Sequence, residues 1–139
     1  MSISVDEVFR GSPLLGTHAM DEVTAIQKEL FARFLDHRGT ATYLGDSISF
    51  EPGVFPPRPD SVVLAQSMEI SWGAKVLDVG VGSGVLSVVA ARRLGWGKSG
   101  NKQGRIVGTD VSLLAVQCAA NNMRRIFGDV DGNLNIEVA

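Results

Sequence analysis

The amino-acid sequence predicts an α/β protein whose core is a doubly wound, mostly parallel sheet. From residue 74 onward, short apolar runs typical of buried strands alternate with longer segments of helical periodicity. Three glycines on alternate positions, Gly80, Gly82 and Gly84, separate the first of these strands from the first of these helices. The chain has 139 residues, a usual size for one domain with its own core.

The order of the elements can be given by residue number. We expect strands at residues 75–79, 105–109 and 135–138, and helices at residues 85–94 and 113–126. Ser112 is the expected N-cap of the second helix. This arrangement is the amino-terminal βαβαβ half of a Rossmann-like sheet.

A helix and a hairpin are expected ahead of this unit. Apolar residues spaced three and four apart predict an amphipathic helix at residues 20–35. Two β-prone runs, residues 40–44 and 48–50, flank the turn-forming residues 45–47 and predict a hairpin. We therefore divide the chain into an N-terminal extension, residues 1–52, and the sheet unit, residues 53–139.

A proline-rich segment joins the hairpin to the sheet unit. Its three prolines fix φ and exclude a regular helix until after Pro59. Asp60 or Ser61 is the expected cap of a helix that continues through residues 62–70.

Composition indicates an ordinary globular protein. The chain is 45% hydrophobic and 20% charged, with a formal net charge of −2, which identifies no polyanionic partner. Cys118 is the single cysteine, so no disulfide can form within the chain. The first residues do not resemble a secretory signal, and the apolar runs are too short to cross a bilayer. We expect a soluble cytoplasmic protein.

The glycines indicate a ligand that approaches the backbone closely. Gly80, Gly82 and Gly84 permit positive φ and leave no Cβ between the amides of the turn and a ligand. A tight turn without a ligand is the alternative. Because the third glycine comes one position too early for the G-x-G-x-x-G pattern, a nicotinamide enzyme is disfavoured.

Two acids suggest the chemistry of that ligand. Asp78 precedes the first glycine by two residues, where it would repel a pyrophosphate but could hold an ammonium group. Asp110 follows the second strand, where such folds place the acid that binds both ribose hydroxyls, although it could instead cap the next helix. A ribose at one end and an amino-acid head at the other describe S-adenosylmethionine.

The motif DVGVGSG at residues 78–84 resembles the glycine-rich motif of class I S-adenosylmethionine-dependent methyltransferases, and the resemblance runs from about residue 50 to residue 138. The element PRPDS at residues 57–61 is similar to the Pro-Arg-Pro-acid-Thr element of HemK-like protein-glutamine methyltransferases. In that family this element folds over the methionine end of the cofactor. The resemblance therefore implies cofactor contacts for the following residues: Phe55, Arg58, Pro59 and Ser61.

HemK-like enzymes also carry an Asn-Pro-Pro-Tyr motif that binds the amide nitrogen to be methylated. This sequence has no Asn-Pro-Pro motif, so we assign no catalytic residue. The expected reaction is methyl transfer to a nitrogen nucleophile, with a protein glutamine favoured by the resemblance. A non-catalytic cofactor-binding or partner module is the alternative. A half-built parallel sheet leaves an open edge, so we expect either that the chain is a fragment that stops after the third strand, or that self-association or a completing chain covers this edge.

Weaker signals bear on metals and nucleic acids. His18, His37 and Cys118 have no recognisable metal-ligand spacing. Seven basic residues gather in the second half and could form a nucleic-acid patch, although solvated helix ends and loops explain them equally well: Arg92, Arg93, Lys98, Lys102, Arg105, Arg124 and Arg125. A nucleic-acid substrate therefore ranks behind a protein substrate.

Overall fold

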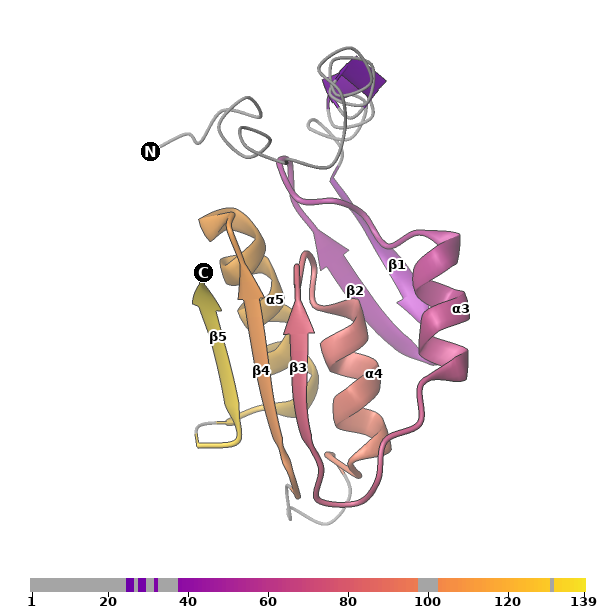
Figure 1. Ribbon diagram of the computed structural model, residues 1–139, viewed down its shortest axis with the longest axis vertical. Helices are drawn as coiled ribbons and strands as arrows, with labels where there is room; N and C mark the ends of the chain where they lie inside the picture. The colour runs from indigo at the N-terminus through magenta and orange to yellow at the C-terminus, as the bar shows by residue number, and fades with distance from the viewer. Residues whose placement is uncertain (1–24, 27, 30–31, 33–37, 98–102, 131) are drawn as a thin grey trace, which may run out of the picture.

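The computed structural model describes residues 25–26, 28–29, 32, 38–97, 103–130 and 132–139. The helix predicted at residues 20–35 lies mostly outside the described residues. The remaining elements form a parallel sheet backed by helices and a separate antiparallel hairpin (Figure 1).

The main sheet has three parallel strands in the order β3 (Lys75–Val79), β4 (Arg105–Asp110) and β5 (Leu134–Val138). The crossover helices are α4 (Val85–Arg93) and α5 (Leu113–Phe127), and both lie on the same face of the sheet (Figure 1). Right-handed crossovers between neighbouring parallel strands place helices in this way. The predicted α/β, Rossmann-like βαβαβ unit is confirmed.

Alternation along the strands decides which side chains form the core. Ile106 of β4 is fully buried with Met123 of α5 and Val88 of α4. Leu77 and Val79 of β3 point to the opposite face and are 64% and 76% exposed. The core therefore lies on the helix-covered side of the sheet, and Tyr43 and Ile48 belong to the same cluster.

The hairpin consists of β1 (Gly39–Tyr43) and β2 (Asp46–Phe50), paired from Gly39 with Phe50 to Tyr43 with Asp46. Its loop is the two residues Leu44 and Gly45, with φ of 48° and 89°. The predicted three-residue loop at residues 45–47 is wrong. Two successive positive φ values match the twist of a tight hairpin, which allows β2 to begin at Asp46.

The helix after the prolines, α3 (Pro59–Ser67), begins earlier and ends earlier than predicted. Arg58 is its N-cap, so the predicted caps Asp60 and Ser61 are wrong, and Ile70 lies beyond its end. Proline at the first helical position explains the early start, because its fixed φ suits a helix and its missing N–H would have no partner there. α3 packs against α4, and Arg93 of α4 donates to the carbonyl of Ala65 at 2.8 Å.

Candidate functional site

The three glycines follow the carboxyl end of β3, and all have positive φ. A Cβ on Gly80 would meet nothing within 4 Å, and a Cβ on Gly82 would meet only the carbonyl of Gly80 at 3.9 Å. A Cβ on Gly84 would lie 3.0 Å from the Cα and Cβ of Ala119. The first two glycines therefore leave open space beside the backbone, whereas the third allows α4 to approach α5.

The ends of β3 and β4 are fastened together at this turn. The amides of Gly80 and Val81 donate to the carbonyl of Thr109 at 2.8 and 2.9 Å. Gly82 N donates to Asp110 Oδ2 at 3.0 Å, and Asp110 Oδ1 accepts the amide of Ser112 at 2.9 Å. Each carboxylate oxygen has a second lone pair, so Asp110 keeps acceptor capacity for a hydroxyl group.

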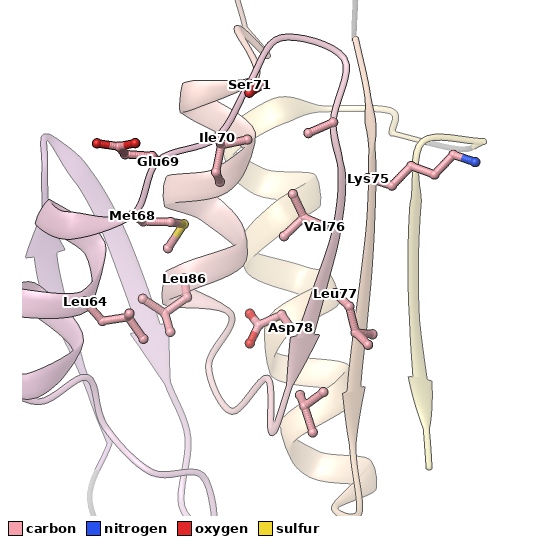
Figure 2. Close-up of a pocket in the computed structure, with 12 residues that line it drawn as sticks. Leu64, Met68, Glu69, Ile70, Ser71, Lys75, Val76, Leu77, Asp78 and Leu86 are labelled. Atoms are coloured by element: carbon pink, nitrogen blue, oxygen red, sulfur yellow. The ribbon is translucent and has the colours of Figure 1, made fainter.

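Asp78 lies beside the same turn, and its carboxylate points toward Leu86 of α4 (Figure 2). Its Oδ2 accepts the hydroxyl of the fully buried Ser87 at 2.6 Å. Burial raises the pKa of Asp78, hydrogen bonds from Ser87 lower it, and the nearby charge of Asp110 raises it. A cation bound here would favour the charged carboxylate and relieve the cost of burying it.

The proline element is held by the hairpin. The Tyr43 hydroxyl donates to the carbonyl of Arg58 at 2.7 Å, and Pro59 and Ser61 lie in the first turn of α3. Val54 is buried with two residues of α5, and the following residue, Phe55, is exposed. The structure thus brings together Asp78, the glycines and Asp110 at the ends of β3 and β4. The proline element is held instead by the hairpin.

Residues 62–137, more than half of the chain, match the sequence profile of the ribosomal protein L11 methyltransferase (PrmA) family. The chain belongs to the PrmA family. This family is one of class I S-adenosylmethionine-dependent methyltransferases, so the predicted class is confirmed.

A relative of known sequence is also a methyltransferase by name. A curated protein of Methanocaldococcus jannaschii, provisionally named a protein N5-glutamine methyltransferase, is 32% identical over 80 residues, which are 58% of this chain and 36% of that protein. The chain therefore spans about a third of the length of this relative.

Two solved structures share the fold. Pyrococcus horikoshii TYW2, solved in complex with MeSAdo, gives a TM-score of 0.54 at 13% identity over 73% of this chain and 35% of its own. A provisionally named transferase of the same organism gives a TM-score of 0.54 at 14% identity, covering 86% of this chain and 46% of its own. At such identities the likeness concerns the fold alone.

A groove of about 570 Å³ lies along β3 of this PrmA-family chain, between this strand and the segment that leads to it from α3 (Figure 2). Its walls carry Leu64 and Met68 from the α3 side and Leu86 from α4, and Asp78 lies at one end. The glycines and Asp110 are not among its lining residues. The groove therefore reaches the glycine turn at Asp78 and Val79, and its lining combines apolar side chains with the polar residues Glu69, Ser71 and Lys75.

Two residues of the site were not identified from the sequence. Ser87 holds the carboxylate of Asp78, and Asn122 of α5 donates to the carbonyl of Ser83 inside the glycine turn at 2.8 Å. The sequence offered one signal for both residues, because each is a polar residue among the apolar positions of its helix, α4 for Ser87 and α5 for Asn122. It gave no indication of a partner, because the partners belong to other elements.

Several of the basic residues considered for nucleic-acid binding are engaged within the protein. Arg92 forms a bidentate pair with Asp46 and lies over the ring of Phe127 at 4.8 Å, and Arg125 donates to the carbonyl of Ser47. These arginines attach the hairpin to α4 and α5. Among the described residues, no group of acids, histidines and cysteines could hold a metal ion, and no helix is long and apolar enough to cross a membrane.

Proposed function

We propose that this chain binds S-adenosylmethionine at the glycine turn and forms the cofactor-binding part of an enzyme that methylates a nitrogen atom. The observation that carries the proposal is the open backbone at Gly80 and Gly82 with a carboxylate on each side. Family membership supports the same cofactor.

Each residue has a distinct task in this proposal. Asp78 binds the ammonium group of the methionine moiety, and Asp110 accepts the ribose hydroxyls while its bond to Gly82 N fixes the turn. Gly80 and Gly82 permit backbone approach. The bound cofactor supplies a methyl group activated by a sulfonium, so the protein mainly has to align the reacting atoms. The proline element covers the methionine end through these residues: Phe55, Arg58, Pro59 and Ser61.

A protein glutamine is the proposed methyl acceptor. The PRPDS element at residues 57–61 and the assignment of the Methanocaldococcus jannaschii relative both support it. We assign no catalytic residue, because the sequence has no Asn-Pro-Pro motif to hold an amide.

The open edge of β3 is the proposed attachment point for further polypeptide. β3 is one of the two outer strands of the sheet, its Leu77 and Val79 are exposed, and the groove runs along it. A strand from a completing chain or a second copy would pair with this edge. Size-exclusion chromatography with light scattering, on the chain alone, tests self-association.

Calorimetric titration tests cofactor binding. We expect S-adenosylmethionine to bind the wild-type chain, and Asp78→Ala to weaken binding about tenfold or more, because a charge-assisted bond to the ammonium is lost. Asp129→Ala is the matched control, since Asp129 is exposed beyond the far end of α5. No heat with wild-type protein, or equal affinity for both variants, would reject the proposed site.

The acceptor requires a separate assay. Cell extract is incubated with the chain and S-adenosylmethionine that carries a radioactive methyl group, and protein and RNA are then separated. A methylated glutamine side chain releases volatile methylamine on acid hydrolysis, whereas a methylated lysine retains its label. Label confined to RNA would replace the protein substrate with a nucleic acid. Cofactor binding without any transfer would favour a non-catalytic module.

A further inference from the structure

Asn122 is a buried polar residue that forms hydrogen bonds with two distant segments of the chain and with Arg125 on its own helix. Its side chain is 2% exposed. Oδ1 accepts the amide of Ser49 at 3.0 Å and the guanidinium of Arg125 at 2.8 Å. Nδ2 donates to the carbonyls of Ser49 at 2.7 Å and Ser83 at 2.8 Å. An amide offers two acceptor sites and two donors, so all four are occupied.

The two segments that Asn122 joins are the hairpin and the glycine turn. Ser49 lies in β2 and presents both its N–H and its C=O to the Asn122 amide, which therefore takes the place of a neighbouring strand. Ser83 lies between Gly82 and Gly84, and it is itself 2% exposed. The turn thus has a fixed connection to the hairpin in addition to its bonds with β4.

The same hairpin also holds the proline element. The Tyr43 hydroxyl, on β1, donates to the Arg58 carbonyl at 2.7 Å. The hairpin is therefore linked to both parts of the proposed cofactor site, directly to the proline element through Tyr43 and indirectly to the glycine turn through Asn122 of α5.

We propose that Asn122 is a positioning residue for cofactor binding, which holds the glycine turn in its binding shape and in register with the proline element through the hairpin. This inference rests on the proposed function. Asn122 makes no contact with the cofactor in this proposal. It acts through Ser83, whose carbonyl sets the orientation of the turn.

The test compares Asn122→Asp with Asn121→Asp. The two residues are adjacent on α5, but Asn121 is exposed, so both variants add the same charge and only one disturbs the amide. A carboxylate at position 122 cannot donate to Ser49 or Ser83. At pH 8 we expect S-adenosylhomocysteine to bind Asn122→Asp about tenfold or more weakly than Asn121→Asp.

Thermal unfolding separates positioning from general damage. A purely structural role would lower thermal stability and leave the affinity of the folded protein unchanged. Equal affinities of the folded Asn122→Asp and Asn121→Asp variants at pH 8 would overturn the proposal.

Amide hydrogen exchange in ligand-free protein gives an independent readout. We expect faster exchange at Gly82 and Gly84 in Asn122→Asp than in Asn121→Asp, and equal rates would again overturn the inference. If wild-type protein does not bind S-adenosylhomocysteine, the proposed function fails while this exchange comparison still decides the role of Asn122. Should Asn122→Asp not fold, Asn122→Ser serves instead, because its short hydroxyl cannot reach both segments.

Discussion

The two faces of the main sheet have opposite surroundings. Ile106 of β4 is fully buried against α4 and α5. Leu77 and Val79 of the adjacent β3 are 64% and 76% exposed. Strands with one wet face normally alternate apolar and polar residues, whereas β3 carries aliphatic residues on both faces. The difference indicates that the sequence is suited to a sheet covered on both sides.

The first and largest test of this comparison is a pair of truncations. Ile106→Ala should lower the free energy of unfolding by about 2–5 kcal/mol, because it removes buried methylenes and leaves a cavity. Leu77→Ala should change it by less than about 0.5 kcal/mol in the isolated chain. Urea unfolding followed by circular dichroism measures both. A large loss for Leu77→Ala would mean that the chain already covers its second face in solution, for instance by self-association.

The glycine turn also has one packed side and one open side. Gly84→Ala should destabilise by about 2 kcal/mol, because the new Cβ is strained by φ of 82° and lies 3.0 Å from Ala119. Gly80→Ala has the same type of backbone strain but meets nothing within 4 Å, so about 1 kcal/mol is expected. Thermal unfolding gives the order of stabilities.

In a cofactor titration of the same two variants, we expect Gly80→Ala to lose more affinity than Gly84→Ala, which is the reverse of their order in lost stability. The open space at Gly80 is where the proposed ligand approaches, so Gly80→Ala should weaken binding more than its small effect on folding implies. If Gly80→Ala bound S-adenosylmethionine as tightly as wild type, the open side of the turn would not be the ligand side.

The sequence predicted the parts of the fold that depend on local pattern. Short apolar runs identified β3 and β4, and Ser112 was correctly expected to cap α5, where it accepts the amide of Ala115. The start of α3 was missed because a hydroxyl or carboxylate cap was preferred over proline at the first helical position. Local preferences compete at such boundaries, and tertiary packing decides between them.

The candidate site could be predicted only in its outline. The positions of Gly80, Gly84 and both acids follow from the motif, but their separate roles depend on which elements lie opposite. Nothing local shows that Gly84 faces Ala119, or that Asn122 bonds to Ser49, which lies 73 residues away in the sequence. Such assignments require the three-dimensional arrangement.

The smallest expected effect concerns Asp78, which lies on the covered side of β3 at the end of the groove. Burial raises its pKa above the ordinary 3.8. The charged carboxylate therefore costs stability at neutral pH, and this cost disappears as the pH falls through the folded-state pKa toward the unfolded value. Asp78→Asn removes the charge and retains an oxygen for the Ser87 hydroxyl.

We therefore expect Asp78→Asn to be slightly more stable than wild type at pH 7, with the difference shrinking toward pH 4. Its affinity for S-adenosylmethionine should fall at pH 7, because the neutral amide loses the attraction to the ammonium group. Chemical denaturation across this pH range, with titration at pH 7, measures both quantities. A carboxylate retained only for folding would give the opposite result, with a less stable variant that binds normally. If Asp78→Asn is more stable but binds more weakly than wild type, the charge of Asp78 serves the binding of a cationic ligand at a cost in folding stability.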